Sequence, residues 1–175
     1  NHLLPFINAA DLEVAHDITV QVMNALREDT GTKFVGIMYG GFIATKNGIK
    51  LIEYNARFGD PEAMNVLPIL KTDFVDICMA MARGELRGMP IEFEKKATVC
   101  KYVVPEGYPD NPVKGAKIEV SGVPEGVKTY YASVDQREDG LYLSGSRAIA
   151  FVGIGDTIAE AEALAQSAVT SVSGP

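Results

Sequence analysis

The sequence predicts an α+β protein in which an antiparallel sheet with helices is followed by a small β-rich domain. Three observations support this fold class. Apolar residues recur at helical spacing near the start of the chain. Asn47-Gly48 stands between two apolar runs, as in a β-hairpin, and the second half of the chain consists of short apolar segments separated by turn residues.

The first expected element is a helix over 9–28. Asn8, with Asp11 three residues later, is typical of a helix N-cap. The apolar face that we expect to be buried consists of Val14, Ile18, Val22 and Leu26.

A hairpin follows, with strands over 34–45 and 49–57. Its turn is placed at Asn47-Gly48 because these residues readily adopt positive φ angles. The next helix is expected to start at Asp60, which would cap it, with Pro61 in its first turn.

Pro68 interrupts that helix. Thr72 is expected to cap a further helix that ends at Gly84. Residues 85–96 are rich in Gly, Pro and charge, which is typical of a boundary between domains. We therefore expect one domain over 1–88, a linker over 89–96 and a β-rich domain over 97–175.

The β-rich domain is expected to end with a helix capped by Asp156. Its strands are predicted at 97–104, 116–121, 128–135, 141–144 and 147–152.

Composition limits the classes of function. The chain has 175 residues, a formal net charge of −7 and no basic stripe, which argues against binding to a nucleic-acid backbone. No apolar run is long enough to span a membrane. Cys78 and Cys100 show no metal-ligand spacing, so a reduced, cytoplasmic setting is expected, without zinc or a disulfide framework.

The return strand of the hairpin carries the strongest chemical signal. Side chains alternate along a strand, so Glu53, Asn55 and Arg57 are expected on one face, together with Leu51. A carboxylate and an amide oxygen two residues apart form part of a site that Mg²⁺ accepts, and an arginine can neutralise charge on a transferring phosphoryl group. The alternative is a solvated face of an edge strand with one Glu–Arg pair.

The strand leads into a continuous polar block, Arg57-Phe58-Gly59-Asp60-Pro61-Glu62. Asp60 and Glu62 are expected at a helix N-terminus, where acidic side chains also cap the helix and interact favourably with its dipole. The block resembles the signature of the glycinamide ribonucleotide synthetase (phosphoribosylamine–glycine ligase) family of ATP-grasp enzymes. Further segments resemble that family in order and spacing: 36–42, 52–62, 72–75, 97–99, 105–109 and 146–148.

The resemblance implies the C-terminal part of an ATP-grasp domain over 1–88 and the family's β-rich C-terminal domain over 97–175. It implies ATP-dependent ligation of glycine to 5-phosphoribosylamine through glycyl phosphate, giving glycinamide ribonucleotide, ADP and phosphate in purine biosynthesis. Mg²⁺ or Mn²⁺ is the implied metal, with ATP as co-substrate, and neither a nucleic acid nor a membrane is an expected partner.

Carried over position by position, the resemblance gives six residues a role. Glu53 and Asn55 would bind the metal, and Arg57 would be the catalytic stabiliser of phosphate charge. Asp60, Glu62 and Arg147 would bind substrate. For Arg147, which lies in the turn 144–147, the alternative is an exposed arginine at a strand end.

One position departs from the pattern of many ATP-grasp enzymes, which carry another acidic metal ligand on the strand before the Glu-x-Asn pair. Here residues 35–45 contain no acid, and Gly40 and Gly41 stand near that place. The start and end of the sequence suggest an excised fragment, inactive alone. Two other functions stay open: an ATP-grasp ligase with a different amine substrate, and a truncated non-catalytic module.

Overall fold

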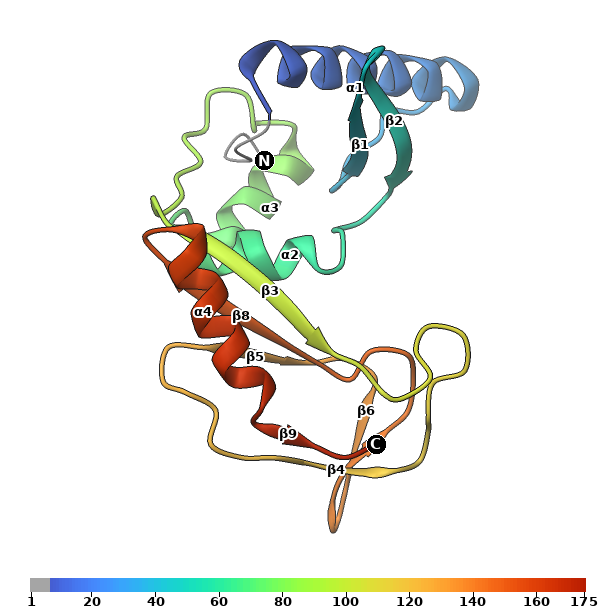
Figure 1. Cartoon of the computed structure of the whole chain (residues 1–175). Helices are drawn as coiled ribbons and strands as arrows, with labels where there is room; N and C mark the ends of the chain where they lie inside the picture. Colours follow the sequence, from blue (N-terminus) through green and yellow to red (C-terminus); the bar gives the residue numbers. More distant parts are fainter. Residues whose placement is uncertain (1–6) are drawn as a thin grey trace. The chain divides into compact units, whose positions relative to one another are not determined.

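The chain passes three times between two structural units (Figure 1). The first unit contains the chain as far as Asp60 together with Thr72–Ile91, and the second contains Pro61–Lys71 and Glu92–Pro175. The computed structural model describes residues 7–175, so the first six residues of the expected domain 1–88 lie outside the described part. The expected division into 1–88, 89–96 and 97–175 stays a prediction.

Helix α1 (Ala9–Thr30) of the first unit begins as predicted. Asp11 N donates to Asn8 Oδ1 over 2.9 Å and Asn8 N donates to Asp11 Oδ2 over 3.2 Å, which closes a capping box. The helix ends at Gly31, whose φ of 68° is a left-handed conformation that favours glycine.

The predicted buried face of α1 is only partly correct. Ile18 and Val22 are half-buried, whereas Val14 and Leu26 are 44% and 37% exposed. Helix α1 packs on the hairpin of β1 (Tyr39–Thr45) and β2 (Gly48–Asn55). This short ribbon does not cover the whole helix, and residues 24–30 of α1 are exposed.

The register of the hairpin contains a β-bulge. Gly41 pairs with Glu53 and Phe42 pairs with Leu51, so Ile52 is the extra residue. An extra residue reverses the alternation of faces on one side of it. Leu51 therefore lies on the face opposite Glu53, and the prediction that these two side chains share a face is wrong.

One face of the hairpin packs against α1. The Tyr54 ring meets Phe42 edge-on, with 6.0 Å between ring centroids, and the Tyr54 hydroxyl lies 2.7 Å from Thr19 Oγ1 of α1. Glu53 and Asn55 alternate with Tyr54, so they lie on the other face of the hairpin.

Helix α3 (Phe74–Arg83) completes the first unit and ends at Gly84, as predicted. Its cap is Asp73 rather than Thr72. The Asp73 carboxylate accepts from Val75 N over 2.7 Å and from Asp76 N over 3.2 Å. A charged carboxylate that reaches two amides replaces the hydroxyl of Thr72 as the cap.

The segment 61–71 belongs to the second unit and contains α2 (Glu62–Val66) and the 3₁₀-helix η1 (Leu67–Ile69). Pro61 occupies the N-cap position of α2 without a side-chain hydrogen bond, so the prediction that Asp60 caps this helix is wrong. Helix α2 ends at Val66 and Pro68 lies in the first turn of η1, as expected where a proline removes a helical amide.

Two antiparallel sheets form most of the second unit. One has the order β3-β8-β5 and the other the order β6-β7-β4-β9. The strands are β3 (Ala97–Val103), β4 (Lys117–Val120), β5 (Lys128–Tyr131), β6 (Val134–Arg137), β7 (Gly140–Leu143), β8 (Ile149–Gly155) and β9 (Val172–Ser173). The predicted strand 128–135 is therefore two strands in different sheets, a break that its apolar pattern does not reveal.

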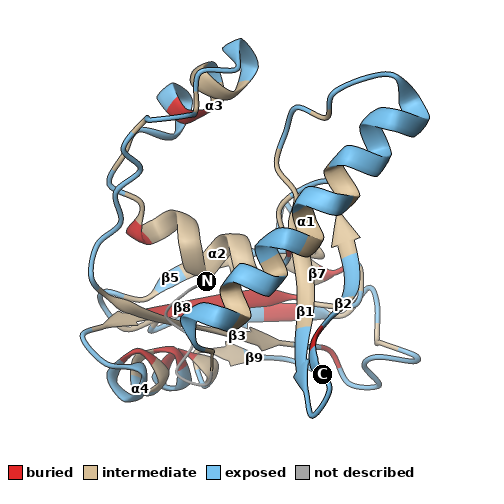
Figure 2. Ribbon diagram, turned by 90° about the horizontal axis from the view of Figure 1, so that it is seen from above, coloured by how far each residue is buried: buried red, intermediate tan, exposed pale blue. Residues whose placement is uncertain are grey.

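Strand β8 lies at the centre of the first sheet, buried on both faces (Figure 2). Helix α4 (Ile158–Val169) packs on one face, where Ala161 and Ala165 are fully buried. The approach is close because Gly153 has no side chain: a Cβ there would lie 2.0 Å from the carbonyl oxygen of Ala161. On the other face α2 packs against β3, where Thr98 Oγ1 donates to Asn65 O over 3.0 Å.

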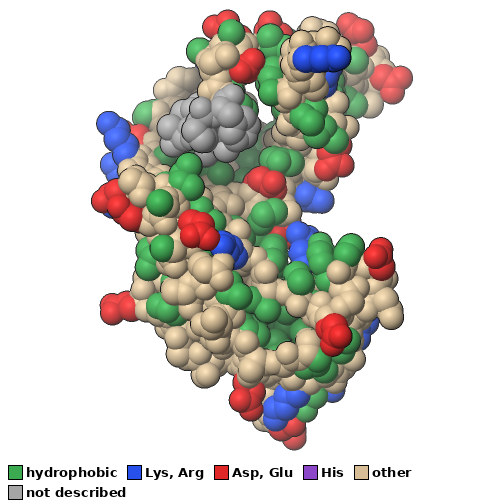
Figure 3. All heavy atoms as spheres, in the orientation of Figure 1, with side chains coloured by type: hydrophobic (Ala, Val, Ile, Leu, Met, Phe, Trp, Pro, Cys, Tyr) green, Lys and Arg blue, Asp and Glu red, His purple; other side chains and the backbone are tan. Residues whose placement is uncertain are grey.

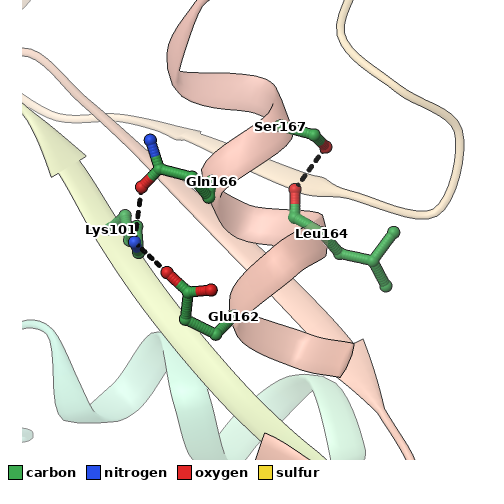
Figure 4. A network of polar contacts seen from close by, with 5 residues as sticks. All are labelled: Lys101, Glu162, Leu164, Gln166 and Ser167. Atoms are coloured by element: carbon green, nitrogen blue, oxygen red, sulfur yellow. Dashed lines mark hydrogen bonds and ion pairs between the residues drawn. The ribbon is translucent and has the colours of Figure 1, made fainter. Parts of the chain in front are cut away.

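Polar contacts also attach α4 to the sheet (Figure 4). Lys101 of β3 donates to Glu162 and Gln166, one helical turn apart on α4. The helix is capped by Thr157, whose Oγ1 accepts from Glu160 N over 3.2 Å. The prediction that Asp156 caps α4 is wrong, and this carboxylate instead pairs with Lys96.

We predict that Gly153→Ala destabilises the second unit by at least about 2 kcal/mol, because overpacking must displace α4 from β8. The matched control is Gly41→Ala in β1, where a Cβ would meet the Glu53 side chain at an ordinary 3.6 Å. The control should change stability by less than about 1 kcal/mol. Urea denaturation of the 175-residue chain, followed by circular dichroism, measures both. Equal stabilities of the two variants would contradict the close packing at Gly153.

Candidate functional site

Glu53 and Asn55 are brought together at the end of β2. Asn55 Nδ2 donates to Glu53 Oε1 over 3.1 Å, on the hairpin face that α1 does not cover. Rotation of the Asn55 carboxamide by half a turn would place its oxygen beside the Glu53 carboxylate. The two side chains then present hard oxygen donors of the kind that Mg²⁺ or Mn²⁺ prefers.

The opposite strand adds no ligand to this pair. Glu53 faces Gly41 and Asn55 faces Tyr39 across the β1–β2 register. Within residues 7–175, no three His, Cys, Asp or Glu side chains gather closely enough to hold a metal ion. The donor set therefore fits a partial site, to which phosphate oxygens and water would contribute the remaining ligands.

Arg57 and Asp60 also lie in the first unit, beyond the end of β2. Because the strand ends at Asn55, the alternation of its side chains does not extend to Arg57, contrary to the prediction. Arg57 Nη1 donates to the carbonyl oxygen of Phe58 over 2.8 Å. This bond uses one of the five N–H groups of a guanidinium. Asp60 is exposed.

Glu62 and Arg147 lie in the second unit. Glu62 is the first residue of α2 and is half-buried. Arg147 lies in the turn between β7 and β8, and its guanidinium carbon is 4.9 Å from the centroid of the Tyr102 ring. No functional role of Tyr102 was predicted from the sequence. The ring comes close to Arg147 through the pairing of β3 with β8. The contact could therefore not be predicted without the strand register.

A second tyrosine lies on the same sheet face as Tyr102. Tyr102 and Tyr130 both pair with Ala150 of β8, from opposite sides. Burial, together with the nearby Cys100 thiol, raises the pKa of Tyr130. This hydroxyl therefore stays protonated at neutral pH and serves as a neutral hydrogen-bonding group.

Surface charge and helix length bear on the expected partners. On the face drawn in Figure 3, basic side chains stand singly among acidic ones rather than in a stripe. Among the described helices, none combines the length and hydropathy needed to cross a bilayer.

Two family models match the chain. Residues 2–63 match the model described as phosphoribosylglycinamide synthetase, ATP-grasp (A) domain. Residues 98–175 match the model described as phosphoribosylglycinamide synthetase, C domain.

Curated relatives match nearly the whole chain. A phosphoribosylamine–glycine ligase of Methanocella arvoryzae is 52% identical over 172 residues, covering 98% of this chain and 40% of the relative. A phosphoribosylamine–glycine ligase of Methanocaldococcus jannaschii is 50% identical over 179 residues, covering 99% of this chain and 40% of the relative. The chain thus spans about two-fifths of the length of the curated relatives it matches.

Solved structures are similar to this chain as well. A crystal structure of phosphoribosylamine–glycine ligase from Thermotoga maritima is similar over 97% of this chain and 41% of its own, with a TM-score of 0.76 and 27% identity. A urea carboxylase of Kluyveromyces lactis shares the fold alone, with a TM-score of 0.52 and 13% identity over 75% of this chain and 12% of its own. The fold is therefore the predicted combination of helices and antiparallel sheet, and the chain belongs to the phosphoribosylglycinamide synthetase family, of which it carries part of the ATP-grasp domain and the C domain.

Proposed function

We propose that this chain is part of a phosphoribosylamine–glycine ligase that acts in the cytoplasm. The enzyme would use ATP to phosphorylate the carboxylate of glycine. The amine of 5-phosphoribosylamine would then attack glycyl phosphate, giving glycinamide ribonucleotide and phosphate beside the ADP already formed. The relatives named as such ligases support this reaction, and the Glu53–Asn55 pair is the structural observation that carries it.

The first unit would contribute the metal site. Glu53 and Asn55 would bind Mg²⁺ or Mn²⁺ through one carboxylate and one carboxamide oxygen. When bound, the cation would supply charge neutralisation for ATP phosphate oxygens. Arg57 would offer its remaining N–H groups to the transferred phosphoryl group, whose charge is spread over three oxygens.

The other proposed residues would hold the amine substrate. Asp60 and Glu62 carry carboxylates, which accept hydrogen bonds from an amine and so orient it for attack. Arg147 would bind the phosphate group of 5-phosphoribosylamine, because a guanidinium matches phosphate with two parallel hydrogen bonds. We place the functional boundary of the ATP-grasp part and the C domain in the linker 89–96.

We predict that Glu53→Gln in the full-length enzyme lowers turnover by roughly 10²–10³-fold at saturating ATP and Mg²⁺. The substitution keeps the shape of the side chain but removes the charge that holds the cation. Its effect on thermal stability should be small, because Glu53 is exposed. Steady-state rates and parallel thermal melts test both statements.

The matched control for Glu53→Gln is Tyr54→Phe, on the neighbouring residue and the opposite face. It removes the hydrogen bond to Thr19, which costs about 1 kcal/mol of stability, and should leave turnover near wild type. Wild-type turnover in a folded Glu53→Gln enzyme would refute the metal assignment. It would favour the alternative of a solvated strand face.

We predict that the 175-residue chain alone folds but does not catalyse the ligation. The reason is that it spans about two-fifths of the related ligases and that its residues 7–175 present only a partial metal site. Release of ADP that depends on both glycine and 5-phosphoribosylamine is the assay. Such release by the purified chain would overturn this expectation, while inactivity of the full-length protein would favour the non-catalytic module.

A further inference from the structure

The turn that carries Arg147 is held on both sides by main-chain hydrogen bonds. Ser133 N donates to Arg147 O over 2.8 Å, and Ser144 N donates to Ser133 O over 2.9 Å. On the other side, Ala148 N donates to Val103 O over 3.1 Å. The backbone at Arg147 is thus fixed to β3 and to the connection between β5 and β6.

Side-chain packing in this turn is equally tight. A Cβ at Gly145 would lie 2.6 Å from Ser133 Cβ, so the turn admits only glycine at this position without a shift. Ala148, which follows Arg147, is 2% exposed and belongs to the core cluster of the second unit. The Cα of Arg147 therefore has a well-defined position, and the remaining freedom is that of its long side chain.

The Tyr102 ring limits that freedom. The guanidinium carbon of Arg147 lies 4.9 Å from the ring centroid, within the range of a cation–π contact. An aromatic ring stacks on the flat face of a guanidinium. The N–H groups of the guanidinium point outward in its plane, where they can donate hydrogen bonds. The ring itself is held by β3, where Tyr102 pairs with the fully buried Ala150 of β8.

We propose that Tyr102 is a positioning residue, whose ring holds the Arg147 guanidinium in place for the phosphate group of a phosphomonoester substrate. This inference rests on the proposed function, in which Arg147 binds the phosphate of the amine substrate. It adds a residue that touches no substrate and acts through Arg147. Lysine would not replace this arginine, because an ammonium group lacks the planar fork.

The central test compares Tyr102→Leu with Tyr102→Phe in the full-length enzyme. Loss of the ring in Tyr102→Leu should raise the KM for 5-phosphoribosylamine about fivefold, as expected for one cation–π contact, with kcat and the KM values for ATP and glycine unchanged. Tyr102→Phe keeps the ring and should stay within about twofold of wild type. Equal losses in the two variants would assign the effect to the hydroxyl and overturn the proposal.

A binding measurement separates this effect from catalysis. Ribose 5-phosphate serves as the probe, because it carries the phosphate without the reactive amine, and ribose is its phosphate-free control. Calorimetric titration should show weaker binding of ribose 5-phosphate to Tyr102→Leu by the same factor. The matched control variant is Tyr131→Leu, which removes an exposed ring from β5, where Tyr131 pairs with Ile149 on the other sheet face. It should bind as wild type does, and an equal loss in this control would overturn the proposal.

Variants of Arg147 distinguish failure of this inference from failure of the proposed function. Arg147→Gln should weaken ribose 5-phosphate binding by about tenfold or more, and Tyr102→Leu should add nothing in that background. If Arg147→Gln weakens binding while Tyr102→Leu does not, the positioning role is wrong and the phosphate role stands. If Arg147→Gln binds as wild type does, the phosphate role itself is wrong.

One further variant keeps the test decisive if Tyr102→Leu does not fold. Arg147→Lys retains the positive charge but loses the planar group that stacks on the ring. It should weaken ribose 5-phosphate binding about fivefold, close to the effect expected of Tyr102→Leu. Wild-type affinity in Arg147→Lys would show that charge alone suffices, and it would overturn the positioning role of Tyr102.

Discussion

The second unit depends on the burial of β8 between two layers. Residues 148–153 are buried and contain no polar side chain. Each element that packs on this strand therefore buries apolar surface against it, which stabilises the unit. The close approach of α4 requires a glycine at position 153. Strands β3 and β5 pair with the two edges of β8, so the backbone groups along both edges must be accessible for hydrogen bonds. A strand of this kind has one register that satisfies both its faces and its edges.

The register of β8 also determines the surroundings of Arg147. Because β8 begins two residues after Arg147, the core fixes the turn that carries this arginine. The same register places Ala150 between Tyr102 and Tyr130, and the small side chain of Ala150 leaves room for both rings. Packing of the core and placement of a polar group at the surface are therefore consequences of one strand alignment.

Local signals in the sequence predicted most of the elements, although three helix caps lie one residue later than predicted, at Pro61, Asp73 and Thr157. Long-range pairing decided most of what the sequence did not predict. The capping box at Asn8 and the helix end at Gly84 follow from neighbouring residues, and both were predicted. The bulge at Ile52 and the contact of Tyr102 with Arg147 depend on which strands pair, and in which register. Of the proposed site, the Glu53–Asn55 pair was predictable because two residues on one strand need no register to meet.

The bulge determines which residues surround the Glu53–Asn55 pair. It turns the apolar Leu51 to the face of Phe42 and leaves Glu53 opposite Gly41, which has no side chain.

An aspartate at position 55 would place two like charges within about 3 Å, and their repulsion would separate the donors when no cation is present. Asparagine instead donates to Glu53 over 3.1 Å and keeps the two side chains together. A carboxylate with a carboxamide carries one charge rather than two, so its affinity for a divalent cation depends more on the oxygens that a phosphate substrate brings.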